Sequence, residues 1–204
     1  MVKFTPNYLS KKISEQIIYY NPDFRSRQDS IRYGLEWMLA AINQILLVFI
    51  IACYFDCVIQ AMVILSAGGF LRMFSGGSHF KGYYYCLFFS TFQIMVITYI
   101  SIEFAFHFSR GMKWMLIGLI VLSFFIFLKK SPKLHKKMQV FSPQQRTEIK
   151  YRSICVFLGL MLVSLLVDSQ LQYGIWIAMI MQSITLTDSW HKIILSFDKR
   201  FNKK

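Results

Sequence analysis

Six long apolar runs, separated by short basic segments, constrain the fold of this chain more than any other feature. The runs occupy residues 37–55, 57–71, 84–102, 114–128, 154–167 and 171–186. With 55% hydrophobic and 16% charged residues among 204, the chain has more apolar sequence than one soluble core can bury. We therefore expect an all-α, polytopic integral membrane protein with about six transmembrane helices. Runs two, four and five are shorter than the roughly 20 residues of a full crossing, so we expect them to be tilted, extended or partly re-entrant.

The distribution of lysine and arginine predicts how the chain is oriented. Short cytoplasmic loops of membrane proteins are enriched in these residues. If the N-terminus is cytoplasmic, all 23 Lys and Arg residues lie on the cytoplasmic side except Arg110 and Lys113. We expect a multi-pass protein of the cell (plasma) membrane with both termini in the cytoplasm. The formal net charge of +13 then reflects membrane orientation, and we expect no nucleic-acid partner.

The chain has no segment that reads as a soluble domain, so we expect a single membrane domain over residues 1–204. It would comprise a cytoplasmic or interfacial segment (1–36), a helical membrane core (37–187) and a basic cytoplasmic tail (188–204). The first 36 residues contain no apolar stretch of the kind that a cleaved signal peptide needs.

The N-terminal segment has the pattern of an amphipathic interfacial helix. Thr5 and Pro6 are typical of a helix start, and Leu9, Ile13 and Ile17 recur at a spacing of four beside charged residues. Asn21-Pro22 would end this helix. Attachment to the membrane surface is the simplest role for it, and precursor docking or a dimer contact is the alternative.

A polar loop between the second and third runs holds the strongest candidate for chemistry. In residues 72–86, His79 and Cys86 stand in a segment interrupted by Gly76, Gly77 and Gly82. A thiolate is an effective nucleophile, and an imidazole close to it can accept the thiol proton. The loop therefore predicts a catalytic pair of a cysteine-protease kind.

The spacing of the pair limits its geometry. On one continuous helix, seven residues separate two α-carbons by about 10.5 Å along the axis, whereas a base and a nucleophile need about 3 Å. We therefore expect His79 to lie off the helix, in a segment folded back by the glycines. A helix would then begin near Tyr83 and carry Cys86 in its first turn, where the helix dipole favours negative charge.

Other readings of the loop stay open at this point. One alternative is that His79 only caps or braces a membrane loop, since a histidine and a cysteine seven residues apart also occur by chance. A structural zinc normally has four ligands, and no further histidine or cysteine clusters nearby in the sequence. We expect no metal and no cofactor.

A second basic segment follows the fourth run. It includes Lys129, Lys130 and Lys133, together with the dipeptide Ser131-Pro132. Contact with anionic lipid would account for these charges, at about 1 kcal/mol for each charge near the surface. The alternative is a cradle for an acidic peptide.

Amides within the runs are expected to hydrogen-bond between helices, which is the commoner role of such residues in a membrane. These amides are Asn43, Gln44, Gln60, Gln93 and Gln182.

The main alternative function is a non-enzymatic transporter or peptide exporter subunit, which would use polar groups inside the membrane. A transporter should tolerate Cys86→Ser, whereas a thiol protease should not.

The polar loop resembles that of the accessory gene regulator B (AgrB) membrane endopeptidases of peptide quorum sensing. That family's pattern of Arg, Gly, His and Cys is met by Arg72, Gly77, His79 and Cys86, with Gly76 completing a glycine pair. Chain length, apparent spans, a cytoplasmic site and the basic loop after the fourth run also agree. The chain departs from many relatives in having Phe80 after the histidine, which we expect to alter substrate fit.

The resemblance implies a specific reaction. A small propeptide with an acidic C-terminal tail would lose that tail through an acyl-enzyme on Cys86, with His79 moving the proton, and would cyclise to a thiolactone or lactone autoinducing peptide precursor. Arg72 would orient a substrate carboxylate or stabilise the loop, and N–H groups near Gly76 and Gly77 or at the helix start would bind the oxyanion. The resemblance also implies Lys129, Lys130 and Lys133 as substrate-binding residues and a homodimer among membrane lipids.

Overall fold

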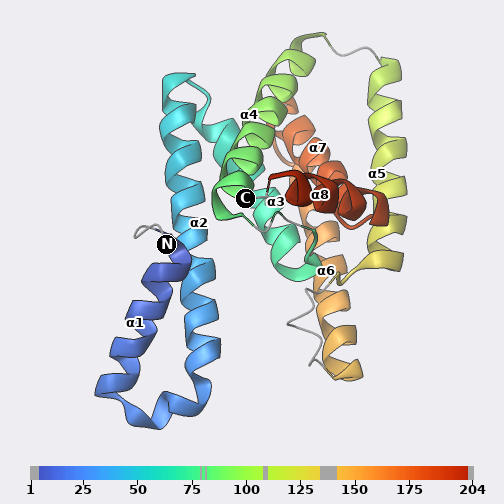
Figure 1. Cartoon of the computed structure of the whole chain (residues 1–204). Helices are drawn as coiled ribbons and strands as arrows, with labels where there is room; N and C mark the ends of the chain where they lie inside the picture. Colours follow the sequence, from blue (N-terminus) through green and yellow to red (C-terminus); the bar gives the residue numbers. More distant parts are fainter. Residues whose placement is uncertain (1–4, 79, 81, 108–109, 134–141, 202–204) are drawn as a thin grey trace. The chain divides into compact units, whose positions relative to one another are not determined.

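A computed structural model describes residues 5–78, 80, 82–107, 110–133 and 142–201. Its regular elements are helical throughout the described residues, as expected (Figure 1). They are α1 (Pro6–Tyr20), the 3-10 helix η1 (Pro22–Arg27), α2 (Gln28–Tyr54), α3 (Val58–Ser75), α4 (Tyr83–His107), α5 (Arg110–Lys130), α6 (Pro143–Ser164), α7 (Ser169–Thr185) and α8 (Asp188–Phe201).

The chain divides into two compact units, residues 1–51 and 52–204. In the first unit, the Thr5 side chain caps α1 by accepting a hydrogen bond from the backbone N–H of Tyr8 at 3.3 Å, and Pro6 occupies the first turn. The helix ends at Asn21, whose N–H donates to the Ile17 carbonyl. The predicted start and end of this helix are therefore confirmed, while its position at the membrane interface stays a prediction.

Each of the six predicted apolar runs falls largely within one helix, from α2 to α7. Within the described residues, four helical segments are long and apolar enough to cross a membrane: Pro22–Tyr54, Val58–Ser75, Tyr83–Ala105 and Arg110–Lys130. The first turns of α6 carry charged residues, and the 17 residues of α7 extend about 25 Å at 1.5 Å each, less than the roughly 30 Å of a hydrocarbon core. The structure thus supports a membrane protein, and the six-span count stays a prediction.

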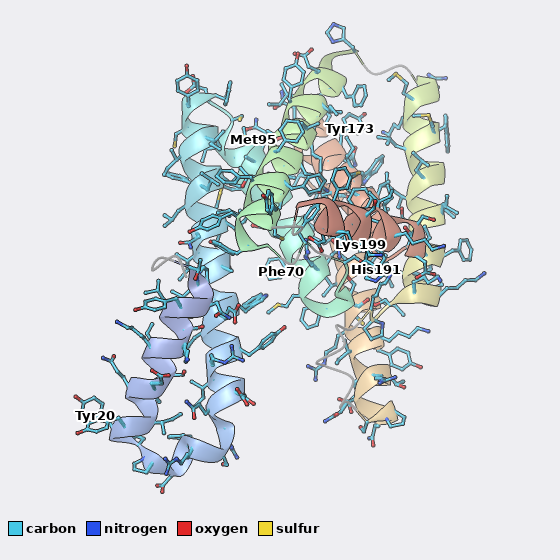
Figure 2. All side chains as sticks on the ribbon, viewed as in Figure 1. Tyr20, Phe70, Met95, Tyr173, His191 and Lys199 are labelled. Carbon is cyan, nitrogen blue, oxygen red and sulfur yellow. The ribbon has the colours of Figure 1, made fainter. Side chains whose placement is uncertain are left out.

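Apolar side chains remain on the outer faces of these helices. Only 22% of the apolar window is buried in Tyr83–Ala105 and again in Arg110–Lys130. Phe70, labelled in Figure 2, is 57% exposed, Phe92 is 68% exposed and Trp114 is 67% exposed. Apolar surfaces of this kind are unfavourable in water, and contact with lipid avoids that free-energy cost.

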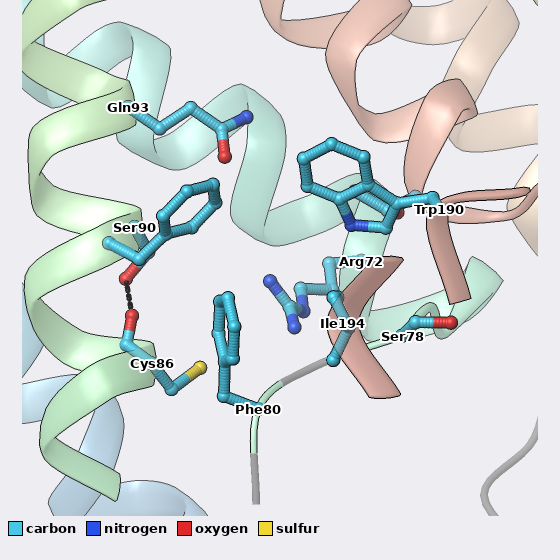
Figure 3. Close-up of a pocket in the computed structure, with 10 residues that line it drawn as sticks. Arg72, Ser78, Phe80, Cys86, Ser90, Gln93, Trp190 and Ile194 are labelled. Carbon is cyan, nitrogen blue, oxygen red and sulfur yellow. Dashed lines mark hydrogen bonds between the residues drawn. The ribbon is translucent and has the colours of Figure 1, made fainter. Parts of the chain in front are cut away.

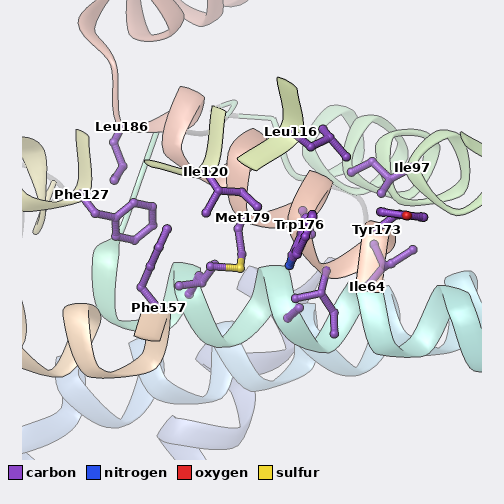
Figure 4. Packing of buried hydrophobic residues seen from close by; sticks show 14 residues of the cluster. Ile64, Ile97, Leu116, Ile120, Phe127, Phe157, Tyr173, Trp176, Met179 and Leu186 are labelled. Carbon is purple, nitrogen blue, oxygen red and sulfur yellow. The ribbon is translucent and has the colours of Figure 1, made fainter. Parts of the chain in front are cut away.

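In the second unit, α7 is the central helix. It packs against α3, α4, α5, α6 and α8, and α8 runs across the bundle rather than along it (Figure 1). A Cβ on Gly174 would lie 2.8 Å from Ile64 Cδ1, so the absence of a side chain permits the close approach of α3. Figure 4 shows Trp176 and Met179 of this helix among the buried side chains of the core.

Polar side chains inside the bundle join its helices, as predicted for the amides. Gln60 Nε2 donates to Gln170 Oε1 at 3.0 Å, and Trp176 Nε1 donates to Ser164 Oγ at 2.8 Å. Every buried side-chain nitrogen and oxygen of the described residues has a hydrogen-bond partner. The two bonds join α3 to α7 and α6 to α7.

Candidate functional site

The candidate site begins where α3 ends. Gly76 ends the helix with a φ of 70°, and Gly77 follows with a φ of 138°. Residues other than glycine rarely adopt either backbone conformation. The space around both glycines is also restricted. A Cβ on Gly76 would collide with the backbone carbonyl of Lys133, and a Cβ on Gly77 would lie 2.8 Å from Thr185 Oγ1. Both glycines are thus required by backbone conformation and by close packing.

Backbone hydrogen bonds attach this loop to the segment after α5. The N–H of Gly77 donates to the Lys133 carbonyl at 3.3 Å, and the N–H of Lys133 donates to the Ser75 carbonyl at 2.9 Å. The pair forms an isolated parallel bridge between Gly76 and Lys133. The loop after α3 and the segment after α5 are therefore one structural unit, although the two lie more than fifty residues apart in the chain.

The C-terminal end of α7 supports the same loop. Gln182 Nε2 donates to Ser75 Oγ at 3.0 Å and to the Gly76 carbonyl at 2.9 Å. The backbone N–H of Ser78 donates to the Thr185 carbonyl at 3.3 Å. Each residue from Ser75 to Ser78 thus has a polar partner on another element.

Cys86 lies in the first turn of α4, as predicted. Helix α4 begins at Tyr83, and the Cys86 N–H donates to the Gly82 carbonyl at 3.0 Å. The thiol is half-buried, and Ser90 Oγ donates to the Cys86 carbonyl at 2.7 Å (Figure 3). His79 lies outside the described residues.

Cys86 and Arg72 line one pocket of about 300 Å³ that is partly open to the surroundings. Helices α3 and α4 therefore bring the motif's arginine and cysteine to the same place. In the view of Figure 3, the ring of Phe80 stands between the thiol and the guanidinium. The other lining residues are Ser78, Phe89, Ser90, Gln93, Thr185, Trp190 and Ile194.

The N–H groups of the glycine pair are already engaged. Gly76 donates to the Arg72 carbonyl at 2.9 Å, and Gly77 donates to Lys133. The start of α4 is the other oxyanion donor expected from the sequence, and this role stays a prediction. Gly76 and Gly77 shape the loop.

The three candidate lysines have different surroundings. Lys133 Nζ donates to the carbonyls of Leu186 and Thr187 at 3.1 and 3.0 Å, and to Asp188 Oδ1 at 3.2 Å. These contacts use all three protons of an ammonium group. Lys130 pairs with the other oxygen of Asp188, whereas the side chain of Lys129 is exposed and forms no ion pair with a described residue.

The Asp188 carboxylate is the charged centre of this cluster. A hydrogen bond from Lys130, and to a smaller extent one from Lys133, lowers the pKa of this carboxylate below its usual range. The positive charge of both lysines adds to the effect. Lys133 thus joins the end of α7 to the start of α8.

Helix α8 is the part of the site that the sequence analysis missed. We interpreted 188–204 as a basic tail, but residues 188–201 form a helix whose Trp190 and Ile194 line the pocket. The spacing of Trp190, Ile193, Ile194 and Phe197 is that of an amphipathic helix, a signal that could have revealed it. In the described ranges, His, Cys, Asp and Glu side chains form no group of three suited to a metal ion.

Comparisons with known proteins agree with the motif. The family model described as accessory gene regulator B matches residues 7–186. The chain is 25% identical to an AgrB-like protein of Clostridium perfringens (strain SM101 / Type A) over 207 residues, covering 97% of this chain and 92% of that protein. No solved structure matches.

Proposed function

This chain belongs to the accessory gene regulator B family, and we propose on that basis that it is a membrane cysteine endopeptidase that processes a small quorum-sensing propeptide. It would remove the propeptide's C-terminal tail and promote cyclisation to a thiolactone or lactone precursor. The observation that carries this proposal is the placement of Cys86 in a pocket with Arg72, directly after the loop that contains His79.

In the proposed first step, the Cys86 thiol gives its proton to His79 and the sulfur attacks the scissile carbonyl. The tetrahedral intermediate then collapses as the C–N bond breaks, and the amine of the tail leaves with the proton returned by His79. The product is a thioester between Cys86 and the shortened peptide.

In the second step, a thiol or hydroxyl of the peptide attacks this thioester. A new thioester or ester closes the ring, and the Cys86 sulfur regains a proton. The apolar rings of Phe80, Phe89 and Trp190 would limit access of water to the thioester, which favours cyclisation over hydrolysis. The first turn of α4 would supply the N–H donors that stabilise the oxyanion.

Arg72 lines the same pocket as the thiol. We assign it the binding of a substrate carboxylate, for which a guanidinium is well suited. Lys129 would attract the acidic tail at longer range. Lys130 and Lys133 would act mainly through Asp188, by holding the pocket in shape.

The positive-inside pattern supports a site on the cytoplasmic side of the plasma membrane, with both chain ends on that side. The proposal includes six spans in a single membrane domain, a homodimer, anionic lipid at the basic segments and the acidic-tailed propeptide as the substrate.

Co-expression of the protein with candidate propeptides encoded beside its gene tests the proposed function. We expect the tail to be removed by the wild type but not by Cys86→Ser or His79→Ala, although both variants insert and accumulate. Normal processing by Cys86→Ser would reject the thiol mechanism and favour a transporter or exporter subunit.

A further inference from the structure

Two consecutive residues of α8 contact Ser78, next to His79 in the sequence, and Phe89, on the helix that carries Cys86. Ser78, the residue before His79, has its hydroxyl hydrogen-bonded to His191 Nδ1 at 3.0 Å. Trp190 packs on Phe89, which follows Cys86 by three residues, with their ring centroids 6.1 Å apart. One turn of α8 therefore connects the loop of the base to the helix of the nucleophile.

The contact at Ser78 is suited to fixing the loop. Ser78 is 8% exposed, its N–H is bound by the Thr185 carbonyl, and its hydroxyl is bound by His191. A hydroxyl can donate to a neutral Nδ1 or accept from a protonated one, so this bond forms with either tautomer. Two bonds to one residue fix where the chain leaves for His79.

The contact at Phe89 is suited to fixing the start of α4. Phe89 also meets Phe80 edge to face, with ring centroids 5.2 Å apart, so three rings form a continuous row along the pocket. Trp190 and the buried Ile194 bring α8 to the pocket that contains Cys86. Such aromatic pairs attract each other beyond the effect of the area they bury.

Helix α8 is itself firmly placed. Asp188 in its first turn is bound by Lys130 and Lys133. The backbone N–H of Trp190 donates to Thr187 Oγ1 at 3.3 Å. The matched family region ends at residue 186, before α8 begins. Trp190 and His191, which make the two contacts from α8, therefore lie outside that matched region.

We propose that α8 is a bracket for the active site, in which His191 is a positioning residue that holds the His79 loop through Ser78 while Trp190 holds the Cys86 helix through Phe89. This inference rests on the proposed function, because it assumes that His79 acts on Cys86. His191 takes no proton from the substrate in this scheme.

Alkylation of Cys86 by iodoacetamide tests the bracket without an identified propeptide. The protein would be the full chain in lipid vesicles, with Cys53, Cys57 and Cys155 replaced by alanine, and the rate would be measured from pH 5 to 9. A free thiol is only a few per cent thiolate at neutral pH, so loss of the base should slow the reaction by about tenfold or more. His79→Ala provides that reference.

We expect His191→Ala and Ser78→Ala each to slow alkylation at pH 7 by about threefold or more, with a pH profile displaced toward that of His79→Ala. The double variant should be no slower than either single variant, because both remove the same hydrogen bond. His191→Asn should restore the rate, since its side-chain amide offers a polar atom at the position of Nδ1. Lys192→Ala, an exposed neighbour, should react like the wild type.

The outcomes separate the bracket from the underlying function. If His79→Ala slows alkylation while folded His191→Ala and Ser78→Ala react like the wild type, the bracket is wrong and the protease proposal stands. If His79→Ala itself has no effect, the catalytic pair and the bracket both fail. Ser78→Ala leaves α8 intact, so it decides the question even if His191→Ala does not fold.

Discussion

The two sides of the site are held in different ways. On the side of the base, residues 75–78 are fixed by directed hydrogen bonds to Lys133, Gln182, Thr185 and His191. On the side of the nucleophile, the start of α4 meets its surroundings mainly through the rings of Phe80, Phe89 and Trp190. Directed bonds tolerate little change in geometry, whereas ring packing adapts to changes of shape. Substitutions on the first side should therefore be the more damaging.

The largest effect should come from Gly76→Ala. The new side chain meets the Lys133 carbonyl in a backbone conformation that costs roughly 1–3 kcal/mol without glycine, so we expect loss of processing and a lower melting temperature. Gly118→Ala in α5 is the matched control, because nothing lies within 4 Å of its added Cβ. Equal melting temperatures for the two variants would show that the turn beside the Lys133 carbonyl does not require glycine at position 76.

Lys133→Ala should have the next largest effect. It removes three hydrogen bonds to the α7–α8 junction, and we expect a loss of roughly 2 kcal/mol in stability together with impaired processing at any salt concentration. Lys129→Ala should leave thermal stability unchanged and weaken propeptide binding only at low salt. If the two variants behave alike, both lysines bind substrate or lipid and Lys133 is not a structural clamp.

Gln182→Ala separates an effect on the site from an effect on the bundle. It removes the bonds to Ser75 and Gly76, which should cost about 1 kcal/mol and reduce processing. Gln60→Ala removes an interhelical bond between α3 and α7 away from the loop and should cost a similar amount of stability with processing retained. Thermal unfolding and tail release would be measured on both, and unchanged processing in Gln182→Ala would count against the loop assignment.

On the aromatic side, Phe89→Leu should be mild. A change between large apolar residues usually costs less than about 1.5 kcal/mol, and Phe89 is 38% exposed. We expect processing within a few-fold of the wild type in a tail-release assay. A loss as complete as that of Gly76→Ala would overturn the contrast between the two sides.

The smallest effect concerns pH. Because the fold lowers the Asp188 pKa, the ionised carboxylate adds stability that is present above its unfolded pKa and is lost as the pH falls through the folded value. The difference in melting temperature between wild type and Asp188→Asn should therefore be constant near neutral pH and disappear in strong acid. A difference that persists unchanged in strong acid would mean that charge is not its cause.

Local patterns predicted the parts of this structure that depend on neighbouring residues. Thr5 and Pro6 marked the start of α1, and the glycines before Tyr83 marked the start of α4, because caps and turns act over a few positions. The bonds of Lys133 to residues 186–188 and of Ser78 to His191 join distant segments, so no local spacing encodes them.

The lysine cluster shows what charge alone does not distinguish. A basic run near a membrane predicts contact with lipid or with an acidic peptide, and that reading treats Lys129, Lys130 and Lys133 as equivalent. The fold makes them different, because Asp188 at the start of α8 comes to lie beside Lys130 and Lys133. His79 lies outside the described residues, so its pairing with Cys86 is a matter for experiment.

The most direct test of the central claim is the intact mass of the purified, membrane-reconstituted protein after incubation with candidate propeptides encoded beside its gene. The account predicts an adduct on Cys86 whose added mass equals that of the propeptide minus that of the released tail, absent from Cys86→Ala. Tail release without any adduct, or release that persists in folded Cys86→Ala, would contradict a mechanism through Cys86.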